Sequence, residues 1–347
     1  MPTNHPIRVY YLSSGRLGIH LLDALLHDDR IDLVGIGSQP DKPCGRKKIP
    51  SPTPLAAYAE EHGCIVDKQD KVNAPDFLDR LRGLDLDFLV VASFGQLLKP
   101  ALLDIPKHGC FNVHASLLPK FRGASPISAA IREGESVTGI SFMSMDPGLD
   151  TGPVYSQLTV PIDDDDDTDS LEEKLGILAA DAICDVLERI QNGTLQPTPQ
   201  DSSRATYAGK IRKTDGAVAW GVPAKQLECK IRAYSPWPTV YMLVPTCKGM
   251  KRIQLTKAEV VKLSCPCPRP GTVLAQDASG ITVACAQDAI KICRLVPEGR
   301  NEMSAADFLR GTTIPANTVF TDYPVEFLNE ANPDKHGGVA DTRRSNT

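Results

Sequence analysis

Residues 109–126 read GCFNVHASLLPKFRGASP, an apolar strand that runs directly into a polar loop containing two prolines. A continuous apolar strand of this kind is typical of a parallel sheet that is covered on both faces. Asn112 and His114 stand two positions apart, so both side chains point to one face at the carboxyl end of the strand. Ligands of parallel sheets bind outside these carboxyl ends. The stretch therefore predicts a site as well as a strand.

Outward from this stretch, apolar strands alternate with amphipathic segments through the first part of the chain. We expect strands at 7–13, 31–37, 64–66, 88–93 and 109–114. We expect helices at 17–26, 54–62 and 74–81, another beginning near Pro126, a β pair at 138–145 and 154–162, and a long helix at 170–191. This alternation predicts an α/β fold with a Rossmann-like, doubly wound, mostly parallel sheet.

The composition of the chain and its pattern of apolar residues change after residue 191. Residues 192–210 are polar and rich in Pro and Ser, which predicts a linker. Short strands separated by turns then predict a small antiparallel β-barrel of OB-like type over 211–323. We expect these strands at 217–220, 239–245, 252–261, 271–277, 280–287 and 289–296. The domain prediction is thus 1–191, 192–210, 211–323 and a disordered tail at 324–347.

Charge is unevenly distributed over a chain whose net charge is −5. Residues 1–210 carry 20 Lys and Arg against 30 Asp and Glu, whereas residues 211–323 carry 15 against 9. A basic second part favours a polyanionic partner that docks on it. Ordinary variation between domains is the alternative.

Several other classes of site are excluded or disfavoured by the sequence. The ten cysteines include one close pair, Cys265 and Cys267, with no second pair and no nearby His, so we expect free thiols and no metal. The five Asp at 163–167 fit a solvated loop at the positive end of a helix better than a cation site. SSGRLG at 13–18 lacks the G-x-G-x-x-G pattern of NAD-binding loops.

Neither a signal peptide, a transit peptide nor a membrane-spanning apolar run is visible in the sequence. Free thiols fit a reducing compartment. We therefore expect a cytoplasmic protein, and we expect it to be a monomer.

A second loop supplies the carboxylate that the Asn and His pair lacks. The stretch MDPGLDTGPVY after the strand at 138–145 contains Asp146 and Asp150, and Gly148 and Gly152 permit a tight turn. An amide can donate to a developing oxyanion, and an imidazole can donate or move a proton. A carboxylate can orient that imidazole. With no evident Ser or Cys nucleophile, the set suits direct acyl transfer to an amine.

Together these motifs resemble the folate-dependent formyltransferases, whose signature is N-x-H, S-L-L-P, R-G-x-x-P and D-x-G-x-D-T-G. The resemblance extends from about residue 7 to residue 323. SQPDKPCGRKKIPSP at 38–52, TYAGKIRKTDGAVAW at 206–220 and IRAYSPWP at 231–238 are most similar to the branch that formylates the methionyl initiator tRNA. SSGRLG stands where the family usually has G-T-P-x-F.

The resemblance implies a role for three groups of residues. Asn112, His114 and Asp150 are implied as catalytic. The tetrahydrofolate site is implied at Ser116, Leu117, Leu118 and Pro119. Contact with tRNA is implied at Arg46 with Lys47 and Lys48, in a basic loop that also contains Lys42. The co-substrate is implied to be 10-formyltetrahydrofolate, and no metal is implied.

Other functions stay open at this point. A hydrolase that deformylates the folate, or a formyltransferase that acts on an amino sugar, could use the same Asn, His and Asp. Neither would need the basic loop or the basic second part. A tRNA-binding protein without activity is a third reading, and the intact catalytic set speaks against it.

Overall fold

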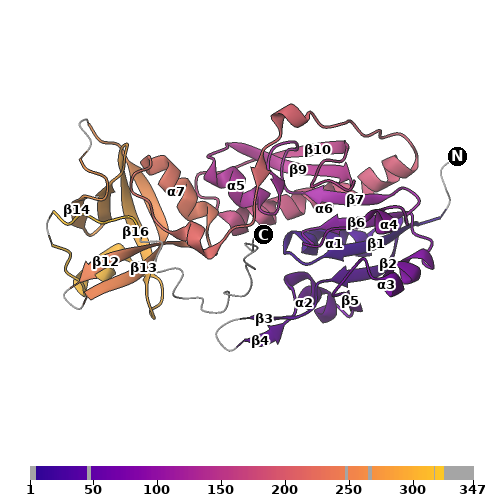
Figure 1. The fold of residues 1–347 in the computed structure, drawn as a ribbon, viewed down its shortest axis with the longest axis horizontal. Helices are drawn as coiled ribbons and strands as arrows, with labels where there is room; N and C mark the ends of the chain where they lie inside the picture. The colour runs from indigo at the N-terminus through magenta and orange to yellow at the C-terminus, as the bar shows by residue number, and fades with distance from the viewer. Residues whose placement is uncertain (1–4, 45–47, 247–248, 265–267, 316, 324–347) are drawn as a thin grey trace, which may run out of the picture. The chain divides into compact units, whose positions relative to one another are not determined.

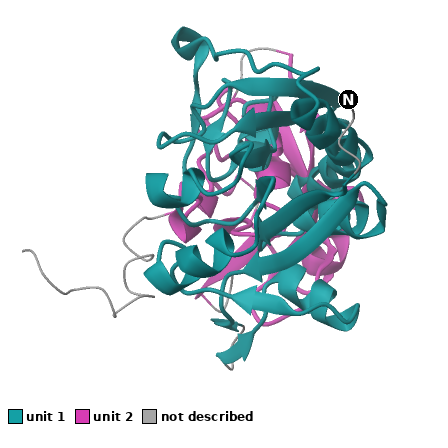
Figure 2. Ribbon diagram, turned by 90° about the vertical axis from the view of Figure 1, so that its right-hand side faces the viewer, with its two compact units in different colours: residues 1–210 teal, residues 211–347 magenta. Residues whose placement is uncertain are grey.

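The computed structural model describes residues 5–44, 48–246, 249–264, 268–315 and 317–323 (Figure 1). Arg46, Lys47, Cys265, Cys267 and the predicted tail at 324–347 lie outside the described residues. The chain divides after Lys210 into two compact units (Figure 2).

The first unit contains a seven-stranded sheet in the order β10-β9-β7-β6-β1-β2-β5. Its strands are β1 (Ile7–Ser13), β2 (Ile31–Ser38), β5 (Val66–Lys68), β6 (Phe88–Ala92), β7 (Cys110–His114), β9 (Val137–Ser144) and β10 (Val154–Pro161). The first five pair in parallel, and β9 and β10 add an antiparallel edge next to β7.

Helices cover both faces of this sheet. They are α1 (Leu17–His27), α2 (Pro54–Glu61), α3 (Pro75–Arg82), α4 (Pro100–Leu103), α5 (Pro126–Arg132) and the long α6 (Thr168–Gln191). Tyr10 and Leu12 of β1 pack with α3 and α4 in one core cluster, whereas the Tyr11 hydroxyl donates to the Gly18 carbonyl of α1. Successive side chains of β1 thus contact helices on opposite faces of the sheet, as the two-residue period of a strand requires. The doubly wound, mostly parallel sheet predicted from the sequence is confirmed.

The element that positions the site is β7. Leu89 and Val91 of β6 stand opposite Cys110 and Asn112 of β7, and Cys110 belongs to the same core cluster as α3 and α4. Asn112 and His114 continue this face of β7 beyond Cys110. Both side chains therefore reach the carboxyl edge of the sheet.

The loop after β1 lies at the point where the strand order reverses, between β1 and β6. The Ser14 hydroxyl accepts a hydrogen bond from the backbone N–H of Gln39 (3.1 Å) and lies 3.2 Å from the Ser38 hydroxyl. A Cβ atom at Gly15 would stand 2.7 Å from the Cβ of Ser93. Close approach of two loops therefore requires glycine within SSGRLG.

Residues 192–210, predicted as a linker, contain two short elements: η1 (Ser202–Arg204) and β11 (Tyr207–Ala208). β11 pairs in parallel with β8 (Arg122–Gly123) in the loop that follows β7. The backbone of Thr198 also forms a bridge with Val154 of β10. This segment thus belongs to the first unit and is hydrogen-bonded to the rest of it.

The second unit contains an antiparallel sheet, as the predicted β domain requires. Its strands follow the order β12-β13-β16-β15-β14, with β17 paired to β16. They are β12 (Val240–Thr246), β13 (Gly249–Val261), β14 (Val273–Asp277), β15 (Gly280–Ala284), β16 (Ala289–Pro297) and β17 (Met303–Ser304), with helices α7 (Ala224–Ala233) and α8 (Ala305–Arg310) and the 3-10 turn η2 (Lys213–Gly216).

One predicted strand of this unit is wrong. Within 217–220, Ala217 forms only an isolated bridge with Tyr241, and Trp220 is buried where its ring stacks with that of Phe320. The apolar residues of this segment fill the core rather than join a ladder. Neither α7 nor α8 was predicted.

No helix among the described residues is long and apolar enough to cross a membrane. The same residues contain no group of three or more His, Cys, Asp and Glu side chains that could hold a metal ion.

Glu172 of α6 is partly buried beside the loop after β1, where its Oε1 accepts the backbone N–H of Leu17 (3.1 Å). Burial raises the pKa of this carboxyl above its ordinary value. The folded state then holds the proton more tightly than the unfolded state, so the free energy of unfolding falls as pH rises through the raised pKa. Glu172→Gln keeps an acceptor for the Leu17 N–H. Because Gln does not ionise, the variant should not lose this part of its unfolding free energy as pH rises.

We expect Glu172→Gln to raise the urea midpoint at pH 8 and to lose that advantage at pH 4.5. Glu173→Gln is the matched control, because Glu173 is exposed and pairs only with His20 within the described region. A Glu172→Gln variant whose midpoint follows that of the parent at both pH values would contradict the burial argument.

Candidate active site

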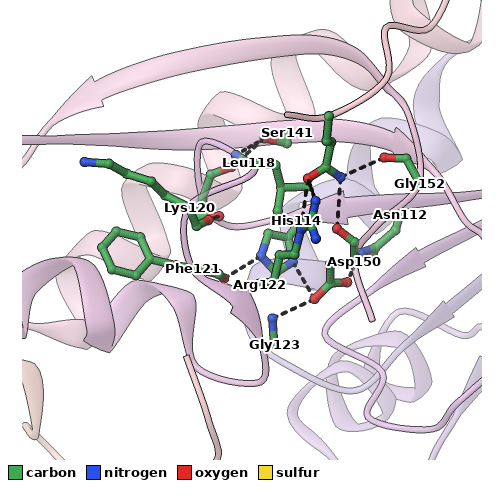
Figure 3. A network of polar contacts seen from close by, with 12 residues as sticks. Asn112, His114, Leu118, Lys120, Phe121, Arg122, Gly123, Ser141, Asp150 and Gly152 are labelled. Atoms are coloured by element: carbon green, nitrogen blue, oxygen red, sulfur yellow. Dashed lines mark hydrogen bonds and ion pairs between the residues drawn. The ribbon is translucent and has the colours of Figure 1, made fainter. Parts of the chain in front are cut away.

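Asn112, His114 and Asp150 converge at the carboxyl end of β7 (Figure 3). Asn112 Nδ2 lies 3.5 Å from Asp150 Oδ1, and His114 Nδ1 lies 3.7 Å from Asp150 Oδ2. Asn112 and His114 are 9% and 6% exposed, so each polar group acts in a largely dry environment. The structure brings together the three residues that the sequence singled out.

The His114 ring is oriented by a backbone carbonyl. Its Nε2 lies 3.0 Å from the carbonyl oxygen of Phe121, which can only accept, so Nε2 carries the proton. In the neutral ring, Nδ1 is then the basic nitrogen, and it faces the Asp150 carboxylate. Nδ1 is thus the ring nitrogen with a free lone pair at the site.

Asp150 adopts a left-handed backbone conformation, with φ of 52°. Few residues other than glycine tolerate this region, and Asp is among the better ones. Its Oδ2 accepts the backbone N–H of Gly123 at 2.7 Å, which ties the carboxylate to β8. The strained turn and this hydrogen bond together aim the carboxylate at His114.

Asp146 and the glycines of the same loop have a structural part. Asp146 Oδ1 accepts the hydroxyl of Thr151 (2.7 Å) and the N–H of Gly148 (3.0 Å). A Cβ atom at Gly152 would stand 1.9 Å from the carbonyl oxygen of Ser144, so the return of the chain past β9 requires glycine. These contacts close the loop that carries Asp150.

The four residues predicted for folate binding form the turn after β7. The Ser116 hydroxyl is fully buried and donates to the Lys120 carbonyl at 2.6 Å, and the Leu118 N–H donates to the Ser141 hydroxyl at 3.0 Å. Leu118 is buried, whereas Leu117 and Pro119 are partly exposed. Ser116 and Leu118 therefore shape the loop, whereas Leu117 and Pro119 keep part of their apolar surface exposed.

Of the basic loop, the structure describes Lys42 and Lys48. Lys42 begins β3 (Lys42–Cys44), Lys48 precedes β4 (Ile49–Ser51), and both side chains are exposed. The two strands pair antiparallel as a small hairpin. Lys42 donates to the side-chain oxygen of Gln39.

Sequence reasoning missed the groups that hold the site in shape. The Phe121 carbonyl orients His114, the Gly123 N–H holds Asp150, and the Gln200 side chain donates to the carbonyls of Asp150 and Gly152. Backbone groups leave no signal in side-chain identity. Gln200 stands in a polar, Pro-rich stretch where nothing distinguishes it from a solvent-exposed residue.

With this geometry in place, comparison with known proteins defines the class. Residues 8–187 match the formyl transferase family, and residues 210–313 match the C-terminal domain of formyl transferases. The two matches together span both compact units.

Individual relatives narrow the class further. The methionyl-tRNA formyltransferase of Geobacter metallireducens is 40% identical over 280 residues, covering 81% of this chain and 88% of that protein. The methionyl-tRNA formyltransferase of Bacillus velezensis is 35% identical over 328 residues, covering 94% and 99%. The chain belongs to the formyl transferase family, as a member of its methionyl-tRNA formyltransferase branch.

Solved structures agree on the fold. WlaRD, a sugar 3N-formyl transferase solved with dTDP and 5-N-formyl-THF, matches 86% of this chain and 100% of its own with a TM-score of 0.60 at 15% identity. HypX from Aquifex aeolicus in complex with tetrahydrofolic acid matches 92% of this chain and 51% of its own with a TM-score of 0.58 at 17% identity. At these identities the likeness concerns the fold alone.

The close contact between β8 and β11 generates a test of the site geometry. Gly123 has φ of 116°, and a Cβ atom there would stand 2.6 Å from the Ala208 carbonyl oxygen. Gly123→Ala should shift the N–H that holds Asp150 and lower kcat for formyl transfer by about 10- to 100-fold.

Gly193→Ala is the matched control, because Gly193 also has a positive φ (68°) but has nothing within 4 Å of its Cβ position. It should cost stability, measured as a lower melting temperature, without changing kcat. Equal kcat for the Gly123→Ala variant and the parent would contradict the role assigned to this contact.

Proposed function

We propose that this protein transfers the formyl group of 10-formyltetrahydrofolate to the α-amine of methionyl initiator tRNA. The observation that carries the proposal is the convergence of Asn112, His114 and Asp150 at the end of β7, in a chain of this family. The product would be formylmethionyl-tRNA, and the second product tetrahydrofolate.

In the proposed reaction the uncharged amine attacks the formyl carbon. A new C–N bond forms to the methionyl nitrogen, the carbonyl oxygen becomes an oxyanion, and the bond from carbon to folate N10 then breaks. The methionyl nitrogen loses one proton and N10 gains one, so no oxidant or reductant is needed. The residues must stabilise the oxyanion and carry the proton.

Asn112 is the oxyanion donor in this scheme, because its amide has N–H groups and no competing charge. Nδ1 of His114 accepts a proton from the attacking amine, since Nε2–H is already committed to the Phe121 carbonyl. The imidazolium that results can also donate from Nδ1 to the oxyanion. Asp150 balances its positive charge at 3.7 Å until the proton reaches N10.

Binding of tRNA is assigned to the basic parts of the chain. In the second unit, residues 211–323 contain more Lys and Arg than Asp and Glu. In the first unit, positive charge is added by the loop that contains Lys42, Arg46, Lys47 and Lys48. Phosphate contacts would supply most of the affinity. The cytoplasmic location and the monomeric state expected from the sequence remain predictions.

The direct test follows the formyl group from 10-formyltetrahydrofolate. The parent should form formylmethionyl-tRNA only when charged initiator tRNA is present, and Asn112→Ala should lower kcat by about 10²- to 10³-fold. Formate release without tRNA would indicate a hydrolase, and formylation of a nucleotide-linked amino sugar would indicate a sugar enzyme. Near-normal turnover by Asn112→Ala would overturn its role at the oxyanion.

Salt dependence tests the basic loop. Arg46→Gln should raise KM for tRNA several-fold and reduce the slope of log KM against log salt by about 1, because one phosphate contact is lost. Arg82→Gln is the control, as Arg82 is an exposed arginine at the end of α3 that pairs with Asp79. An unchanged slope for Arg46→Gln would remove this loop from the interface.

A further inference from the structure

The Gln200 side chain stands at the centre of a hydrogen-bond network behind the site. Nε2 donates to the carbonyl oxygens of Asp150 (2.9 Å) and Gly152 (2.7 Å). Oε1 accepts from Nε (3.1 Å) and Nη2 (2.8 Å) of Arg122. Carbonyls only accept and a guanidinium only donates, so the amide has one possible orientation.

Arg122 fixes the other end of this network. The residue is 2% exposed and, within the part of the chain that the structure describes, forms no ion pair with a carboxylate. Its guanidinium donates to Gln200 and, at 3.4 Å, to the hydroxyl of Ser202. A buried guanidinium is stable only when its N–H groups have acceptors. The Gln200 oxygen is such an acceptor, and the two hydrogen bonds from Arg122 fix its position.

Asp150 is the residue that this network supports. Its left-handed φ of 52° disfavours the observed backbone, and its side chain is aimed by the Gly123 N–H on one side of the residue. Gln200 holds the carbonyl on the other side. Because Gln200 also holds Gly152 two positions later, the amide clamps the whole turn.

We propose that Gln200 is a positioning residue for catalysis, and that its amide keeps the Asp150 turn in the conformation that presents the carboxylate to His114 and Asn112. The inference rests on the proposed function, in which Asp150 stabilises the His114 imidazolium. Gln200 thereby ties the segment at 192–210, which belongs to the first unit, to the turn that carries Asp150.

The Gln200→Glu substitution distinguishes a positioning role from a packing role. Gln200→Glu has the same shape and would pair with Arg122, but an ionised carboxylate cannot donate to the two carbonyls. We expect the variant to stay folded, to keep both KM values within about twofold, and to lose about 10- to 100-fold in kcat. Gln196→Glu is the matched control, because the exposed Gln196 also donates to a backbone carbonyl, that of Gly193.

A double-mutant cycle gives the readout that a purely structural role would not move. If Gln200 acts through Asp150, Gln200→Glu should cost no more than about threefold in the single-turnover rate when placed on Asp150→Asn. The full loss in that background, or parent-like kcat in the single variant, would overturn the proposal.

Folding and function are kept apart by two further measurements. Gln200→Met, which removes both hydrogen-bonding roles without adding charge, is judged by the same criteria if Gln200→Glu does not fold. Failure of both variants to fold would overturn the positioning role, since the residue would then serve the fold. A parent enzyme that folds and binds 5-formyltetrahydrofolate but does not formylate methionyl-tRNA would instead overturn the proposed function.

Discussion

The site depends on the hydrogen bond between His114 Nε2 and the Phe121 carbonyl oxygen. This bond settles which imidazole nitrogen is basic, and that nitrogen is the one that faces Asp150. The partner of His114 comes from the loop seven residues later, so the turn containing Ser116 and Leu118 must close correctly before the imidazole is oriented. The buried Ser116 and Ser141 hydroxyls serve this closure.

The rest of the site is a set of chain segments held against that turn. β9 pairs with β7 and carries Ser141 opposite His114, so the sheet itself delivers the hydroxyl that supports the loop. The turn after β9 brings Asp150, and β11 returns from residue 207 to pair with β8. Polar atoms of backbone and side chain join these segments in a largely buried space, where each hydrogen bond is worth more than in water. A small displacement of one of these segments therefore changes the position of the His114 ring.

Sequence reasoning performed best where burial imposes a simple period. The boundaries of β1, β6 and β7 are within one residue of those expected, because continuous apolar runs flanked by turns have few alternatives. It failed over 217–220, where Val218 and Trp220 are buried in the core without forming a strand. Hydrophobic alternation records burial, and it does not record whether the backbone finds a ladder partner. Helix α7 was missed because its apolar pattern is broken by Glu228. This charged residue is nevertheless buried in the fold, where it forms an ion pair.

By itself, the sequence determined the class of the fold, the family, and the three side chains that meet at the end of β7. Side-chain identity carries that information, since the proposed chemistry uses an amide, an imidazole and a carboxylate. Only the tertiary structure decided which nitrogen of His114 is basic, how Asp150 is aimed, and that Gln200 lies behind it. Those features depend on backbone carbonyls and N–H groups, which every residue possesses, and on contacts across 50 residues or more, as between Gln200 and Asp150. Such groups become specific only when the fold places them.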